Sequence, residues 1–174
     1  LVGSEMCIRD SSIDALSTFM KFLVLISGIL VMLSSSKYLK ISKIFKIEYP
    51  VLLLSSILGM MIMISSNDLI VFYMGLELQS LALYVLASFN RDNQLSSESG
   101  LKYFVLSALS SGLLLYGCSL IYGYSGSTNF LVISQNISEV KYGLTLGIVF
   151  ILVGLAFKIS AVPFHMWTPD VYEG

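Results

Sequence analysis

Two ionisable residues stand inside stretches that are otherwise apolar. Glu77 lies near the middle of residues 69–88, and Lys158 lies sixteen residues into residues 143–162. A charged side chain at the centre of a bilayer costs about 3 kcal/mol on insertion scales, so neither residue is expected to face lipid. Burial disfavours the charged form of a carboxyl and of an amine alike, which allows both to exchange protons near neutral pH. The two residues together indicate proton-transfer chemistry.

Structural roles for the same two residues stay open. Glu77 could be a protonated acid hydrogen-bonded to a neighbouring helix, and Lys158 could extend its ammonium toward the lipid head groups. Pro163 favours a functional lysine, because proline leaves the carbonyl of Ile159, four residues earlier, without its helical hydrogen bond. We therefore expect the last helix to be broken at Pro163, with polar backbone beside the lysine, as in the discontinuous helices of transporters.

Two further residues, His165 and Lys102, are secondary candidates, and a third ionisable residue, Asp68, has a structural interpretation. His165 follows Lys158 by seven residues, which places both on one helical face if the helix resumes after the proline. A relay through water and a simple interface anchor are equally open for His165. Lys102 lies at the start of its apolar stretch, where reaching toward the head groups is the default. Asp68 precedes an apolar stretch and is expected to be a helix N-cap.

The elements that must hold these residues are membrane helices. Hydrophobic residues make up 56% of the 174 residues and charged residues 12%, which excludes an ordinary water-soluble domain. Strict apolar–polar alternation is absent, so helices rather than barrel strands are expected to satisfy the backbone in lipid. The predicted fold is all-α, a polytopic transmembrane helix bundle with about five membrane helices. The apolar stretches are 15–34, 49–64, 69–88, 101–122 and 143–162.

Basic residues predict the orientation of the chain. If successive stretches cross the membrane in opposite directions, most lysines and arginines lie on one side of it. That side is expected to be cytoplasmic. The segments around Asn67 and between 123 and 142 then face outward, and the C-terminal residues return to the cytoplasmic face. Residues 37–46 form either a short interfacial helix or a basic loop. The basic residues on the predicted cytoplasmic side are Lys37, Lys40, Lys43, Lys46, Arg91 and Lys102.

Two motifs carry a family resemblance. GLELQSLALY, which contains Glu77, and FKISAVPFHMWTPDVYEG, which contains Lys158, resemble subunit N, an antiporter-like membrane subunit of respiratory complex I. The resemblance implies that the chain corresponds to about five of fourteen helices and to most of the first of two inverted repeats. It assigns the family's essential glutamate to Glu77, its broken-helix lysine to Lys158 and a further helix lysine to Lys102.

This resemblance also predicts how the chain is divided. Residues 1–12 are polar and unplaced, and whether they are native is left open. Residues 13–48 hold a transmembrane helix and the basic cytoplasmic loop. Residues 49–174 form most of the first repeat of the proton-translocating domain, truncated before its next helix. The chain begins without methionine, and we expect it to be a piece of a longer protein.

The implied function is proton translocation coupled to electron transfer from NADH to quinone, in the bacterial inner membrane. No cofactor or metal is expected on this chain, because Cys7 and Cys118 are too few for an iron–sulfur cluster. NADH, FMN, iron–sulfur clusters and quinone are expected on partner subunits. The expected partners are other membrane-arm subunits and the lipid bilayer, with no nucleic acid. The alternatives are a subunit of a cation/proton antiporter or membrane-bound hydrogenase, and a structural subunit without a proton path.

Overall fold

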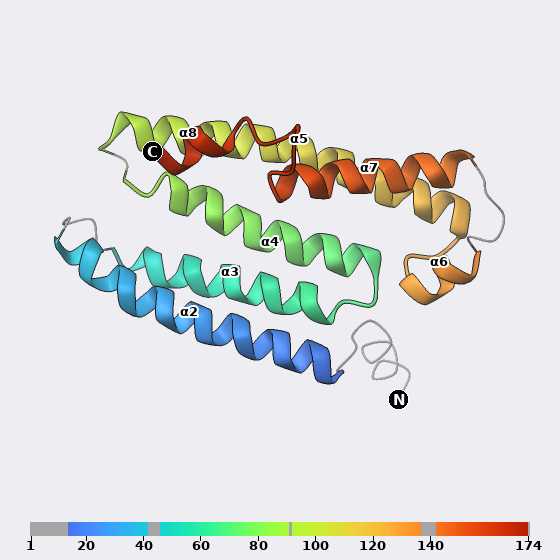
Figure 1. Ribbon diagram of the computed structural model, residues 1–174, viewed down its shortest axis with the longest axis horizontal. Coiled ribbons are helices and arrows are strands. Elements are labelled where there is room, and N and C mark those ends of the chain that lie inside the picture. The colour runs from blue at the N-terminus through green and yellow to red at the C-terminus, as the bar shows by residue number, and fades with distance from the viewer. Residues whose placement is uncertain (1–13, 42–45, 91, 137–141, 174) are drawn as a thin grey trace.

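The computed structural model describes residues 14–41, 46–90, 92–136 and 142–173 of the chain. Helices form the regular structure of these ranges, and an isolated β-bridge joins Asp68 to Asn129. The predicted all-α fold is confirmed. The helices, labelled in Figure 1, are α2 (Ala15–Ile41), α3 (Glu48–Ser65), α4 (Leu69–Ala87), α5 (Gln94–Ser125), α6 (Phe130–Asn136), α7 (Tyr142–Lys158) and α8 (Thr168–Glu173).

The helices form a bundle in which neighbours along the chain lie side by side (Figure 1). α2, α3 and α4 follow one another across the bundle, α5 lies against α4, and α7 packs against α5. Each of α2 to α5 is long and apolar enough to cross a membrane. The remaining apolar helix, α7, has 17 residues and is about 26 Å long, shorter than the roughly 30 Å core of a bilayer. The fifth predicted membrane helix therefore ends early.

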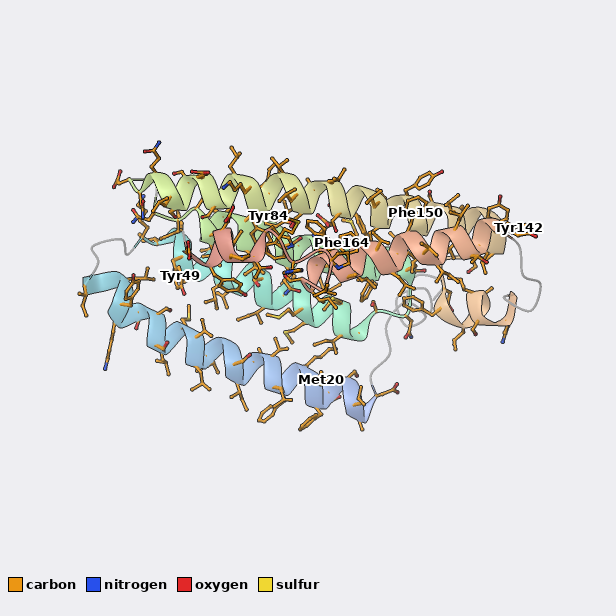
Figure 2. The ribbon with its side chains drawn as sticks, turned by 45° about the horizontal axis from the view of Figure 1, so that its top comes forward. Met20, Tyr49, Tyr84, Tyr142, Phe150 and Phe164 are labelled. Carbon is orange, nitrogen blue, oxygen red and sulfur yellow. The ribbon has the colours of Figure 1, made fainter. Side chains whose placement is uncertain are left out.

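The outer surface of the bundle is apolar. Side chains spread around α2 in all directions, Met20 among them (Figure 2). Leu16, Phe22 and Leu33 of the same helix are all exposed. A helix that is apolar on every side is suited to lipid or to contact with other membrane helices.

The buried face of α5 is instead made of small residues. Membrane helices associate through close packing and not through the hydrophobic effect, so small residues are favoured where two backbones meet. Most of the buried hydroxyls bond to backbone carbonyls, as when Ser111 Oγ donates to Ser107 O at 3.0 Å, whereas the Ser107 hydroxyl has no partner among the described residues. The serines and glycines buried on this helix are Ser96, Ser99, Gly100, Ser107, Ser110, Ser111 and Gly117.

A pair of glycines brings α3 and α4 into backbone contact. A Cβ at Gly59 would lie 2.6 Å from the backbone N of Gln79 and 2.8 Å from Gly75 O. A Cβ at Gly75 would lie 2.9 Å from the backbone N of Met63. Neither position has room for a side chain without separating the helices. Since Gly75 precedes Glu77 by two residues, this contact also fixes the depth of the carboxylate in the bundle.

A capping turn ends α7 at Lys158. Ser160 adopts a φ of 56°, in the left-handed region, and its N–H bonds the carbonyl three residues back at 3.1 Å. The N–H of Ala161 bonds the carbonyl five residues back at 2.8 Å. These two bonds form a Schellman motif, which closes a helix C-terminus. The helix is thus broken, as predicted, but the break starts before Pro163, which lies in the turns that follow.

The two segments predicted to face outward meet at one end of the bundle. Asp68 caps α4, as predicted, by accepting a hydrogen bond from Ile70 N at 2.9 Å, and its other carboxylate oxygen accepts from the Thr128 hydroxyl. Leu69 N donates to Thr128 O at 2.9 Å, which ties the α3–α4 connection to the segment before α6. Short helix α6 was not predicted. Of the basic segment 37–46, residues 37–41 belong to the end of α2, and 42–45 lie outside the described residues.

The α3–α4 contact can be tested with a single methyl group. We expect Gly59→Ala or Gly75→Ala in the full-length protein to destabilise the fold by about 1–3 kcal/mol, because the new Cβ overlaps backbone atoms. Gly112→Ala on α5 is the matched control, since a Cβ there meets nothing within 4 Å. The measurement is the thermal unfolding midpoint in detergent. Equal midpoints for all three variants would contradict the packing described here.

The orientation can be tested with cysteine probes at exposed residues of opposite ends. Tyr124, near the end of α5, lies at the predicted outer end, and Asp92, between α4 and α5, lies at the predicted cytoplasmic end. In intact cells, an impermeant thiol reagent should label Tyr124→Cys and leave Asp92→Cys unlabelled, because lysines and arginines mark the cytoplasmic side. Labelling in the opposite pattern would reverse the orientation.

Candidate functional site

Glu77 of α4 and Lys158 of α7 meet inside the bundle. Lys158 Nζ lies 3.2 Å from Glu77 Oε1, and the side chains are 10% exposed for the lysine and 19% for the glutamate. The sequence singled out both residues separately, each for its cost in an apolar segment. The fold brings them into one ion pair across 81 positions of the chain.

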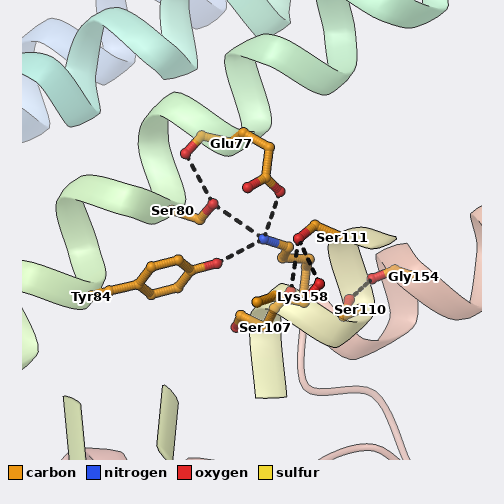
Figure 3. A network of polar contacts seen from close by, with 9 residues as sticks. Glu77, Ser80, Tyr84, Ser107, Ser110, Ser111, Gly154 and Lys158 are labelled. Atoms are coloured by element: carbon orange, nitrogen blue, oxygen red, sulfur yellow. Dashed lines mark hydrogen bonds and ion pairs between the residues drawn. The ribbon is translucent and has the colours of Figure 1, made fainter. Parts of the chain in front are cut away.

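Two hydroxyl groups complete the surroundings of the ammonium (Figure 3). Lys158 Nζ donates to Tyr84 Oη at 2.9 Å and to Ser80 Oγ at 3.1 Å. An ammonium has three N–H groups, and with Glu77 each of them finds an acceptor. We refer to Glu77, Ser80, Tyr84 and Lys158 together as the Lys158 site. This arrangement satisfies a buried charge that would otherwise be costly.

Ser80 and Tyr84 were not predicted as site residues, although the sequence contains a signal for them. Glu77, Ser80 and Tyr84 follow one another at i, i+3 and i+7, which places all three on one face of a helix. Ser80 and Tyr84 are each 5% exposed, so this polar face of α4 points inward. The same spacing within GLELQSLALY could have identified them as partners of a buried cation.

The end of α7 and its packing on α5 position the lysine. A Cβ at Gly154 would lie 2.7 Å from Leu114 Cβ, so only glycine lets the two helices approach this closely. Ser110 Oγ donates to Gly154 O at 3.0 Å and fixes that contact (Figure 3). Lys158 is the last residue of the helix, where the partial negative charge of the carbonyl end favours an ammonium.

A pocket of about 350 Å³ lies beside the ammonium. Its lining is mostly apolar, with Gln79, Ser80, Tyr103 and Lys158 as the residues that carry polar groups. A space of this size next to polar groups can hold water molecules. The Lys158 site thus combines a carboxylate, an amine and room for water.

Lys102 lies apart from the Lys158 site. Its Nζ contacts Glu98 Oε1 and Asp170 Oδ2, each at 2.9 Å, and its side chain is 43% exposed. The pair with Asp170 links α5 to α8. Within the ranges described above, no hydrogen bond or ion pair joins Lys102 to Glu77 or Lys158. Surface ion pairs of this kind contribute little to stability.

His165 is not aligned with Lys158. The expectation that both share one helical face required the helix to resume after Pro163, and this was wrong. Residues 159–167 form turns, α8 begins only at Thr168, and His165 is exposed. The Schellman motif at the end of α7 redirects the chain, so the seven-residue spacing has no helical meaning here.

The part of the chain that the structure describes contains no group of three or more His, Cys, Asp or Glu residues that could hold a metal ion. Cys118 is buried in an apolar cluster with Leu114 and Ile121 of α5 and with Leu69 and Leu76 of α4. Its surroundings are those of a core residue.

Comparisons with known proteins agree with this geometry. The NADH-quinone oxidoreductase subunit N of Pelagibacter ubique is 77% identical over 162 residues, which cover 93% of this chain and 34% of that protein. A chain of respiratory complex I from Thermus thermophilus superposes with a TM-score of 0.66 at 38% identity, covering 74% of this chain and 29% of that one. A chain of an archaeal membrane-bound sulfane sulfur reductase gives 0.68 at 29% identity, covering 71% and 26%.

The chain therefore spans about a third of the length of the curated relative. The family described as the NADH:quinone oxidoreductase/Mrp antiporter transmembrane family matches residues 66–174. That range contains α4, α5, α7 and the whole Lys158 site. With this match over more than half of its length, the chain belongs to the NADH:quinone oxidoreductase/Mrp antiporter transmembrane family.

Proposed function

We propose that this chain is part of a membrane subunit of NADH:quinone oxidoreductase that couples electron transfer from NADH to quinone to proton translocation. The observation that carries the proposal is the buried ion pair between Glu77 and Lys158, 3.2 Å apart at the broken end of a membrane helix. Ionisable residues inside membrane proteins commonly lie on proton paths. The 77% identity to a subunit N supports the same assignment, and it also supports a location in the bacterial inner membrane.

In this proposal, Lys158 carries the proton and Glu77 controls it. While the carboxylate lies beside the ammonium, Coulomb attraction holds the proton on Nζ. A conformational or electrostatic signal from quinone reduction would separate Glu77 from Lys158 or neutralise it. The ammonium then loses its counter-charge and releases its proton to water in the adjoining pocket. Return of Glu77 favours protonation of Lys158 again.

The electron-transfer chemistry belongs, in this proposal, to partner subunits. The sequence offers only two cysteines and no glycine-rich turn between a strand and a helix. NADH, FMN, the iron–sulfur clusters and quinone would bind elsewhere in the complex. This chain would contact other membrane-arm subunits and lipid, and residues 49–174 would form most of a first proton-translocating repeat. Lys102 would have a secondary role in that repeat, through its ion pair with Asp170 of α8.

A cation/proton antiporter subunit is the second candidate, because the matched family also includes Mrp antiporters. A chain of the Mrp complex from Dietzia superposes with a TM-score of 0.64 at 29% identity. The same ion pair could serve either protein. The 77% identity to a subunit N favours the oxidoreductase.

Removal of the carboxylate charge tests whether Glu77 controls the proton. In the full-length subunit within its complex, Glu77→Gln should lower proton pumping and coupled quinone reduction about tenfold or more, because Lys158 loses its counter-charge. Glu77→Asp should be milder. The measurement is NADH-driven proton uptake by membrane vesicles, normalised to assembled complex. Asp92→Asn, at an exposed acid, is the control. Normal pumping by Glu77→Gln would remove the carboxyl from the mechanism.

A charge-preserving substitution separates a proton carrier from a fixed counter-charge. Arginine stays protonated under all physiological conditions, so Lys158→Arg keeps the charge and abolishes the transfer. We expect this variant to assemble but to pump as poorly as Lys158→Ala. The matched control is Lys37→Arg, at an exposed lysine of α2. Should Lys158→Arg pump normally while Lys158→Ala does not, the lysine acts only as an electrostatic partner of Glu77.

A further inference from the structure

The partners of Lys158 differ in whether they can also donate a hydrogen bond. The ammonium donates to Glu77 Oε1 at 3.2 Å, to Ser80 Oγ at 3.1 Å and to Tyr84 Oη at 2.9 Å. All of them serve as acceptors while the lysine is charged. A neutral amine has a lone pair that needs a donor, so the same site faces a different demand after the proton has left.

While Glu77 is ionised, Tyr84 is the partner that can meet that demand without giving up a bond it already makes. An ionised carboxylate accepts and has no hydrogen to donate. The Ser80 hydroxyl hydrogen is already used, because Ser80 Oγ donates to Glu77 O at 3.1 Å. The Tyr84 hydroxyl hydrogen has no acceptor among the described residues, which leaves it free to turn toward the nitrogen of Lys158.

We propose that Tyr84 is a positioning residue that holds Lys158 in both of its protonation states. Its oxygen accepts from the ammonium, and its hydroxyl donates to the neutral amine after the proton has left. The nitrogen therefore stays beside Tyr84 throughout the cycle, ready for the next proton when Glu77 returns or regains its charge. This inference rests on the proposed proton-carrying function of Lys158.

Aromatic packing fixes the Tyr84 hydroxyl independently of the lysine. The Tyr84 ring meets the Tyr103 ring edge to face with centroids 4.7 Å apart, and the Phe104 ring at 5.8 Å. Tyr103 in turn stacks on Trp167 at 4.8 Å. With 5% of its surface exposed, Tyr84 is held in place by these ring contacts. A hydroxyl held in this way offers the amine a fixed point of attachment.

The groups that face this contact set its expected pH dependence. Among the described residues, Glu77 forms the ion pair with Lys158. Glu77 and Tyr84 both lie on α4. On α5, Tyr103 contacts the Tyr84 ring and lines the same pocket as Lys158. Tyr73 of α4 also lies within electrostatic range of Glu77. The expected pH dependence therefore rests on the ion pair between Glu77 and Lys158.

Tyr84→Phe removes the hydroxyl and keeps the ring. In the full-length subunit within its complex, this variant should assemble normally and pump several-fold to about tenfold more slowly, as expected for losing a hydrogen bond to a charged group. The ammonium loses a charge-assisted bond, and the amine loses only a weaker neutral one. The alkaline limb of the pH profile, which is the fall in pumping rate as the pH rises, should therefore move to lower pH by about half to one unit.

The measurement is NADH-driven proton uptake by membrane vesicles from about pH 6 to pH 9, normalised to assembled complex. Tyr116→Phe is the matched control, because Tyr116 lies on α5 with 54% of its surface exposed and packs against Phe150. A Tyr84→Phe profile that superposes on the control, beside a defective Glu77→Gln, overturns the role of Tyr84 and leaves the proposed function standing. A slower rate without a shift in pH also overturns it, since lost packing alone would act at every pH.

The proposed function has a separate point of failure. If Lys158→Ala and Glu77→Gln both pump like the unaltered complex, the ion pair carries no protons and Tyr84 has nothing to position. A shifted alkaline limb in Tyr84→Phe together with defective Lys158→Ala supports both conclusions.

Discussion

A buried ammonium has to find an acceptor for each of its N–H groups, and this requirement organises the centre of the bundle. Lys158 is the last residue of α7, and its side chain is only 10% exposed. Its acceptors come from α4, which therefore has to present a polar face inward. The glycine contact with α3 and the small-residue face of α5 bring α4 and α7 close enough for this.

The helical fold could be predicted from the sequence because lipid offers the backbone no hydrogen-bond partners, so long apolar stretches must be helical. Boundaries set by polar residues could not be predicted in the same way. α5 begins at Gln94, earlier than the apolar stretch, because Asn93 caps a first turn that is rich in serine. The short helix α6 lies in a segment of mixed polarity, where apolar length gives no signal.

Glu77 and Lys158 could be predicted as candidates because burying an isolated charge in an apolar segment costs free energy, so such a residue needs a functional or structural reason. Their contact could not be predicted from spacing, since it depends on which faces of two distant helices meet. Ser80 and Tyr84 were missed because serine and tyrosine are unremarkable in membrane helices until a partner is placed opposite them. The expectation for His165 failed for another reason: it extended one helix through a segment that a left-handed residue at Ser160 redirects.

The hydrogen bonds between Asp68, Leu69 and Thr128 fix one end of α4, and this makes the helix a lever. Any tilt of α4 relative to α5 has to pivot near Leu69. Glu77 then lies about 12 Å from the pivot and Tyr84 about 23 Å, at 1.5 Å per residue. For a given small angle, the tyrosine end moves about twice as far as the carboxylate. A tilt of α4 would therefore displace Tyr84 more than Glu77, so a Lys158 that stays bound to Tyr84 requires Glu77 to withdraw by a movement of its own side chain or to be neutralised, and not by rotation of the helix.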